Sequence, residues 1–349
     1  MKTRNICFGG LLLLGSQLSF SAEHVVLVSV DGLRPEAIQQ LGKDQLPAFY
    51  RFREQGAWTD NARTDFDYTR TLPNHASMMT ARSVTGVNGH GQRDNDMPEP
   101  TATLHNNTGV EAYVSSVFDV THDHGLSTSL YVSKSKFILY DQSYNEKSGA
   151  EDQTGANNGT DKIDRYLFLS PDRTAEALIT QYVEDMSKER FNFSFLHITD
   201  TDGAGHGDRW KTPRYMKALV RVDGYLQKLF DLIDLDAQLS DTAIILVADH
   251  GGAGRSHGDE TDYENFRVPF YVWVSSPDNA GSTLAGRELY ELNQSTRMDP
   301  GANRPDYSDV NQPIRNGDAA NLVLELLGLP AIPDVGATIN AKQDLNIGL

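Results

Sequence analysis

The sequence predicts an α/β fold in which a central, mostly parallel sheet is flanked by helices. Short apolar runs rich in β-branched and aromatic residues alternate with stretches that carry apolar residues at helical spacing, and this alternation is typical of a layered α/β domain. Three of the apolar runs, 25–30, 191–199 and 243–248, end at an aspartate. Because open α/β sheets bind ligands outside the carboxyl ends of their strands, we expect these aspartates to meet in one crevice.

The strands and helices follow from this pattern in chain order. The strand-like runs are 25–30, 129–132, 193–198, 243–247 and 269–274. The helix-like stretches are 47–55, 74–79, 173–188, 214–233 and 318–327. Two polar tracts, about 141–164 and 275–316, are rich in glycine, proline or small polar residues and are expected as insertions. They are interpreted as surface loops near a substrate entrance or simply as disordered loops.

Composition limits the classes of protein that the chain can represent. Its 349 residues, 39% of them hydrophobic, suffice for one large core. The net charge of −17 is unfavourable for binding a nucleic-acid polymer or an anionic membrane. The single cysteine, Cys7, lies near the start of the chain. Disulfides, cysteine nucleophiles and thiolate metal sites are therefore not expected, and any metal should take aspartate and histidine ligands.

The start of the chain resembles an export signal. Lys2 and Arg4 precede an apolar stretch around Leu11–Leu14, and small residues follow. We therefore predict a signal peptide over residues 1–21 and a periplasmic or secreted mature chain, 22–349. The apolar stretch is too short to span a bilayer, so no stable membrane insertion is expected.

The strongest local signal follows the run 243–248. Asp249 and His250 come directly after it, and His257 lies just beyond in a glycine-rich loop. A carboxylate and an imidazole from adjacent residues, with a further imidazole from a loop, suit a metal such as zinc. The alternative is an aspartate that caps a helix and two surface histidines.

A second cluster follows the run 191–199. Asp202 and His206 are spaced so that both side chains can face one ion, and Asp200 competes with Asp202 for that role. Three glycines within 203–207 predict a loop rather than a helix. His197, inside the apolar run, is interpreted as a packed strand residue. The alternative for the cluster is a turn with incidental acidic residues.

The third cluster is Thr71-Leu-Pro-Asn-His75. Pro73 suits the first turn of a helix, so Thr71 would lie just before a helix N-terminus, where free N–H groups favour a phosphate or another oxyanion. A hydroxyl at this position is also an ordinary N-cap.

Together these motifs resemble the type I phosphodiesterase/nucleotide pyrophosphatase family of the alkaline phosphatase superfamily. The motifs, in the family's order, are Asp31-Gly32, Thr71–His75, Asp202–His206, Asp249–Gly251 and His257-Gly258. The resemblance implies an alkaline phosphatase-like catalytic domain over 22–349 and two zinc ions, although other divalent ions are possible. It assigns one ion to Asp202, His206 and His257 and the other to Asp31, Asp249 and His250, with Thr71 beside the latter as a further ligand.

The resemblance also implies a mechanism and a substrate class. Thr71 would be the nucleophile of a phosphoric ester hydrolase that forms a covalent phospho-threonine. The family's asparagine on the non-bridging oxygen is assigned to Asn88. Leu72 stands where nucleotide pyrophosphatases usually have phenylalanine, so nucleotide specificity is weakly supported. The expected partner is a small-molecule phosphoester or phosphonate.

Two alternatives stay open. Lys134 and Lys136 resemble the paired basic residues of phosphonoacetate hydrolases and related threonine-dependent phosphomonoesterases, and would then bind a substrate's extra negative charge, unless they are solvated lysines at a sheet edge. From another class, the chain could be a non-catalytic periplasmic protein that binds metal or phosphate. Retention of Thr71 beside all six expected ligands argues against that reading.

Overall fold

The computed structural model describes residues 21–106, 112–154, 159–275, 284–333 and 339–349. The predicted signal peptide therefore lies outside the described residues, apart from Ser21. Within the described ranges, no helix combines the length and the apolar character needed to cross a membrane.

A mixed sheet of eight strands forms the centre of the described chain, in the order β4-β3-β5-β1-β6-β7-β2-β8. The five strands from β4 to β6 are parallel, whereas β7 is antiparallel to both β6 and β2. The mostly parallel sheet is thus confirmed, together with all five predicted strands. The strands are β1 His24–Val30, β2 Ala57–Arg63, β3 Thr128–Val132, β4 Arg165–Phe168, β5 Phe193–Ile198, β6 Thr242–Val247, β7 Arg267–Val274 and β8 Arg287–Glu288.

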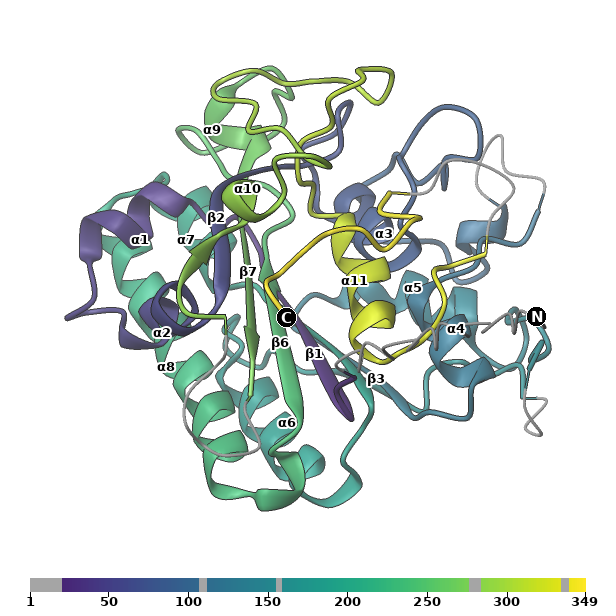
Figure 1. Cartoon of the computed structure of the whole chain (residues 1–349). Helices are drawn as coiled ribbons and strands as arrows, with labels where there is room; N and C mark the ends of the chain where they lie inside the picture. Colours follow the sequence, from purple (N-terminus) through teal and green to yellow (C-terminus); the bar gives the residue numbers. More distant parts are fainter. Residues whose placement is uncertain (1–20, 107–111, 155–158, 276–283, 334–338) are drawn as a thin grey trace, which may run out of the picture.

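Helices cover both faces of the sheet (Figure 1). One layer is centred on α8 (Pro213–Leu235), which contacts α1, α2, α6 and α7. The other contains α11 (Asp318–Leu326), which contacts α3, α4, β1 and β6. The remaining helices are α1 Pro35–Leu41, α2 Pro47–Gln55, α3 Thr71–Thr80, α4 Val117–Asp123, α5 Ile138–Tyr144, α6 Glu176–Glu189, α7 Asp200–Asp208, α9 Tyr263–Phe266 and α10 Leu289–Leu292. The five predicted helices are all present, with ends shifted by up to three residues.

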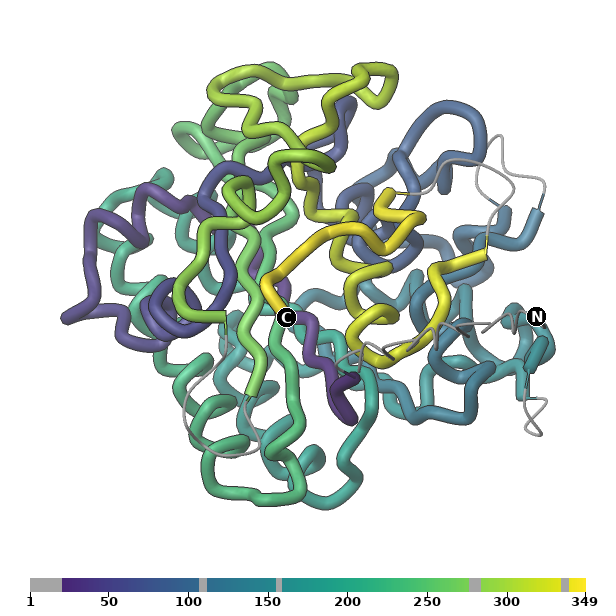
Figure 2. The backbone as a smooth tube through the Cα atoms, viewed as in Figure 1, coloured from purple at the N-terminus to yellow at the C-terminus, as the bar shows by residue number. Residues whose placement is uncertain are grey.

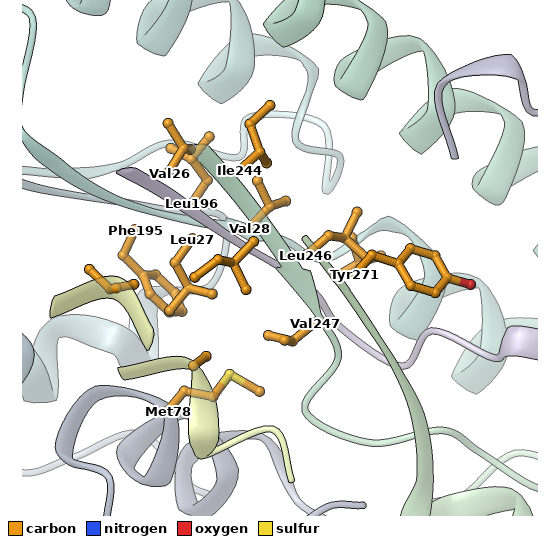
Figure 3. Packing of buried hydrophobic residues seen from close by; sticks show 14 of the residues in the cluster. Val26, Leu27, Val28, Met78, Phe195, Leu196, Ile244, Leu246, Val247 and Tyr271 are labelled. Carbon is orange, nitrogen blue, oxygen red and sulfur yellow. The ribbon is translucent and has the colours of Figure 1, made fainter. Parts of the chain in front are cut away.

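The hydrophobic core lies between the sheet and these two helical layers. Every residue of β1, β5 and β6 is buried, which explains their continuous apolar character. Figure 3 shows Leu27 and Phe195 on the side of the sheet where Met78 lies, and Val26 and Ile244 on the opposite side. Side chains that alternate along each strand therefore anchor both layers.

The polar tracts differ in how far they are structured. The first residues of tract 141–164 continue α5, and residues 155–158 lie outside the described chain. Tract 275–316 contains β8 and α10, and its residues 276–283 also lie outside the described chain. In Figure 2 its later part, in yellow-green, winds back and forth at the top of the view.

The loop predicted around Asp202 is wrong, because residues 200–208 form α7. Packing explains two of its three glycines, Gly205 and Gly207, whereas a Cβ on Gly203 would have no neighbour within 4 Å. A Cβ on Gly205 would lie 2.5 Å from the Trp210 ring, and one on Gly207 would lie 2.9 Å from the Arg214 guanidinium. The glycines therefore allow the residues that follow to fold closely over the helix, and this tertiary packing overrides low helix propensity.

Candidate metal and catalytic site

One group of candidate ligands is fully buried at the carboxyl ends of two adjacent strands. Asp31 follows β1, and Asp249 and His250 follow β6, its parallel neighbour. His250 Nε2 lies 3.4 Å from Asp31 Oδ1 and 3.2 Å from Asp249 Oδ2. The three residues could hold one metal ion, and we call them the buried group.

A second group is formed by Asp202, His206 and His257, which could also hold an ion. Asp202 and His206 are four residues apart on α7, so they share one face of that helix. Nε2 of His206 lies 3.2 Å from Asp202 Oδ1, and Nε2 of His257 lies 3.9 Å from the same oxygen. The side chain of His206 is 47% exposed, so we call these residues the half-exposed group.

Backbone carbonyls orient all three histidines. Nδ1 of His206, His250 and His257 lies 2.9, 2.9 and 2.6 Å from the carbonyl oxygens of Arg255, Gly251 and Thr69, respectively. Each Nδ1 must therefore carry a proton and donate it. The lone pair of each Nε2 is then directed toward the carboxylates, which is the tautomer that a metal ligand requires.

The polar atoms at the centre of the site have the chemistry of cation ligands. Among the described residues, Asp31 Oδ1, Asp202 Oδ1, Asp249 Oδ2 and His250 Nε2 are buried without a hydrogen-bond partner. Buried acceptors without a donor are costly. These four atoms belong to two groups that each offer three protein ligands. Each group therefore fits a divalent ion that keeps an open coordination position.

Lys134 joins the two groups. Its Nζ donates hydrogen bonds to Asp31 Oδ2 at 2.6 Å and Asp202 Oδ2 at 2.7 Å. Burial raises the pKa of Asp31, but the Lys134 charge and the hydrogen bond from His197 outweigh it and leave that pKa well below its usual range. Burial, followed by repulsion from Asp31, raises the pKa of Asp249 well above its usual range. The carboxylates are thus unequal in their affinity for protons.

Thr71 is the first residue of α3, beside the buried group. His75, one turn later, connects the two: its Nδ1 lies 2.7 Å from Thr71 O and 3.7 Å from Asp249 Oδ2. Burial, followed by the neighbouring His197, lowers the pKa of His75 well below its usual range. A neutral imidazole therefore holds the first turn of the helix.

Asn95 contacts the backbone of the first turn of this helix. Its Oδ1 accepts hydrogen bonds from Leu72 N at 2.9 Å and from Lys136 Nζ at 2.8 Å. Asn88, to which the sequence assigned the oxyanion contact, lies instead in the turn that follows Gly86, with a φ of 65°. The sequence pattern carried no signal that separated these two asparagines.

The structure gives roles to two further residues near the site. His197 is a buried strand residue, as predicted, but its Nε2 also donates to Asp31 Oδ2 at 2.9 Å. The sequence signal for this role was a histidine within a mostly apolar strand, because a buried imidazole requires hydrogen-bond partners. Asp200 accepts from Ala175 N, Arg221 Nε and Tyr225 OH. These structural bonds leave Asp202 as the member of the half-exposed group.

Comparison with solved structures defines the class of fold. Murine ectonucleotide pyrophosphatase/phosphodiesterase 5, as an inactive variant in complex with AMP, superposes with a TM-score of 0.61 at 15% identity, over 93% of this chain and 100% of that one. A protein of the alkaline phosphatase superfamily from Vibrio parahaemolyticus gives a TM-score of 0.54 at 14% identity, over 88% of this chain and 67% of that one. The chain has the alkaline phosphatase superfamily fold.

The particular family follows from the sequence. The model of the type I phosphodiesterase/nucleotide pyrophosphatase family matches residues 25–313, and the chain belongs to that family. Human ectonucleotide pyrophosphatase/phosphodiesterase family member 1 is 28% identical over 241 residues, which is 66% of this chain. The match spans only 24% of the length of the human protein. The family predicted from the motifs is therefore confirmed.

Proposed function

We propose that the chain is a two-metal phosphoric ester hydrolase that resembles phosphodiesterases and nucleotide pyrophosphatases and uses Thr71 as its nucleophile. The observation that carries the proposal is the pair of carboxylate–imidazole groups beside the N-terminus of α3, with unpartnered acceptors in both. Zinc is the expected metal because each group combines imidazole nitrogen with carboxylate oxygen, although other divalent ions can use such ligands.

The two groups would hold one ion each, and two such ions would neutralise charge on the attacking and leaving oxygens of an in-line displacement. Thr71 Oγ would attack phosphorus to give a phospho-threonine, which water then hydrolyses. At the start of α3, Leu72 N and Asn74 N are bonded to Asn95 Oδ1 and Arg70 O, and Pro73 has no N–H. In the described chain this leaves the N–H of Thr71 to favour a phosphoryl oxygen. Both described bonds to the side chain of Asn95 use Oδ1, which leaves Nδ2 to donate to a non-bridging oxygen. We assign this role to Asn95 rather than Asn88.

Substitution of the nucleophile tests the proposal directly. We expect Thr71→Ala to lower turnover of a nitrophenyl phosphodiester by at least about a hundredfold, because removal of a nucleophile eliminates the covalent route. Metal content, measured by mass spectrometry, should stay at two ions per chain, since six other ligands remain. Activity above about one hundredth of the unsubstituted protein would refute the nucleophile assignment. Zinc binding without turnover of any phosphoester would instead support the non-catalytic binding protein.

A phosphomonoesterase or a phosphonate hydrolase is the second candidate, and the position of Lys136 favours it. Its ammonium group is bonded to Asn95, next to the first turn of α3. A cation there could bind the additional negative charge of a monoester or a phosphonoacetate-like substrate. Lys134, by contrast, is bonded to Asp31 and Asp202, so it would reach a substrate only by leaving these carboxylates.

The two candidates differ in their response to Lys136→Ala. If the substrate is a monoester, kcat/KM for a nitrophenyl monoester should fall about tenfold or more relative to kcat/KM for the diester, because a charge-assisted hydrogen bond contributes about 1.5–3 kcal/mol. An equal effect on both esters would favour the diesterase.

The expected cellular location is also a proposal. We propose that the chain is exported and acts in the periplasm or outside the cell, on the basis of the charged and apolar pattern of residues 1–21. N-terminal sequencing of the protein purified from culture medium or periplasm would test it. A protein that still carries residues 1–21 would contradict it.

A further inference from the structure

A polar cavity of about 450 Å³ lies beside the predicted nucleophile. It is lined by Asp67, Tyr68, Thr69, Arg70, Thr85, Arg93, Gly258 and Glu260. Arg70 immediately precedes Thr71, and Gly258 immediately follows His257. The cavity thus borders both the nucleophile and the half-exposed group, and the catalytic roles assigned above make no use of it.

Hydrogen bonds attach Thr69, which lines the cavity, to His257 of the half-exposed group. His257 Nδ1 donates to Thr69 O at 2.6 Å, and the Thr69 hydroxyl donates to His257 O. Thr71 is connected by His75 to Asp249 of the buried group instead. In an in-line displacement the leaving oxygen departs on the side opposite the nucleophile, which here is the side of the half-exposed group. The cavity is therefore placed to receive the leaving group.

Two exposed arginines give the cavity positive charge. In the described part of the chain, the side chains of Arg70 and Arg93 have no hydrogen bond or ion pair, whereas the buried Arg34 is bonded to Glu36, Glu264 and Gly252 O. Such free guanidinium groups, in a chain with a net charge of −17, are suited to bidentate binding of a phosphate or carboxylate.

The acidic residues of the cavity restrict where an anion can bind. The Asp67 carboxylate accepts a hydrogen bond from the Thr85 hydroxyl, and Glu260 is half-buried. These carboxylates would repel an anion but could accept hydrogen bonds from hydroxyl groups. Asp67 and Thr85 also line a second cavity of about 820 Å³, which therefore adjoins the first at these two residues. The volume of about 450 Å³ of the first cavity alone accommodates a leaving group larger than a single anion.

We propose that Arg70 and Arg93 form a binding site for an anionic group on the leaving part of the substrate. The inference rests on the proposed function and names its substrate class: phosphoesters whose leaving group carries a phosphate or carboxylate. The Thr71 hydroxyl gives its proton to water as the bond between Oγ and phosphorus forms, and the bond from phosphorus to the leaving oxygen breaks. The leaving oxygen takes the electron pair and then a proton from water, while its distant anionic group remains bound to the arginines.

The test compares two aryl methyl phosphodiesters that share the scissile phosphoryl group. One releases 4-nitrophenol and the other releases 3-carboxy-4-nitrophenol, and each rate is divided by the uncatalysed rate of the same ester. We expect Arg70→Gln and Arg93→Gln each to lower the ratio of kcat/KM, carboxylated over plain ester, about tenfold, because each removes a charge-assisted bond. The matched control is Arg287→Gln, an exposed arginine on β8, which should leave the ratio within twofold of the unsubstituted protein.

Binding separates this inference from the proposed function. Calorimetry on Thr71→Ala protein with zinc, with and without Arg93→Gln, measures the ratio of the Kd values of the two diesters. We expect that ratio to shift about tenfold against the carboxylated ester when Arg93 is replaced. Unchanged ratios in both the kinetic and the binding measurements would overturn the anion site. If the unsubstituted protein hydrolyses neither ester, the proposed function fails, and the binding ratio alone decides the inference.

Discussion

The buried group and the half-exposed group use the same ligand types in different settings. Asp31, Asp249 and His250 come from the ends of adjacent parallel strands and are fully buried. Asp202 and His206 come from the glycine-rich α7, and His257 from a loop, with His206 47% exposed. The buried group is therefore part of the sheet, whereas the half-exposed group is formed by a helix and a loop that pack over the sheet.

Burial makes the two groups differ in electrostatics as well. Burial, followed by the neighbouring His257, lowers the pKa of His250 to about 3. The Asp202 carboxylate, 3.2 Å from His206 Nε2, raises the pKa of His206 from its usual value. In the buried group the proton that an ion must displace is therefore held by Asp249, whose pKa is raised, rather than by the histidine, whereas in the half-exposed group it is held by His206. Because it is closed to solvent, the buried group should hold its ion more tightly and exchange it more slowly.

The largest effect is expected at the buried group. Asp249→Asn removes a charged ligand while preserving the side-chain volume, so one ion should be lost and turnover should fall by about a thousandfold. Because the site is fully buried, added zinc should not restore activity. Metal content and turnover would be measured together. Recovery of activity in excess zinc would contradict the assignment of the tighter site to this group.

His206→Ala should have a smaller and reversible effect. A half-exposed ligand can be replaced by water, so we expect turnover to fall about a hundredfold at limiting zinc. Millimolar zinc should restore much of it. Isothermal titration would locate the weakened site, and loss of both ions would show that the two groups do not bind independently.

His197→Gln should have the smallest effect of the three. This side chain orients Asp31 without binding metal itself, and removal of such a partner typically lowers metal affinity 10–100-fold. The weakening should be confined to the buried group. His24→Gln is a matched control, since His24 is also a buried strand histidine but bonds Phe191 O near the start of β1. A similar affinity in both variants would assign His197 a purely structural role.

Sequence reasoning was most successful where a buried strand ends in a polar residue. Asp31 and Asp249 could be located because parallel strands share one carboxyl edge, so their order in the chain did not matter. The family resemblance then divided the histidines between two groups, and the structure assembles the same two sets. Strand β2 was missed because its sequence, with Asp60 and Asn61 inside it, lacks an apolar run, although most of its residues are buried.

The remaining features depend on tertiary contacts that no local pattern encodes. Asn95 accepts a hydrogen bond from Leu72 N, 23 residues earlier in the chain. Nothing in the sequence around Asn95 distinguishes it from Asn88. The helix at α7 was predicted as a loop because glycine propensity was judged without Trp210, whose ring covers Gly205. In both cases a residue outside the local pattern determines the local structure.

The glycines of α7 also have a consequence for the dynamics of the protein. Each glycine within a helix costs about 1 kcal/mol relative to alanine, so α7 depends for its stability on packing against α8 and Trp210 and on whatever binds Asp202 and His206. Segments with low local stability open before the rest of a domain. The amide protons of α7 should therefore exchange with solvent faster than those of β1 and β6, and occupancy of the half-exposed group should slow that exchange.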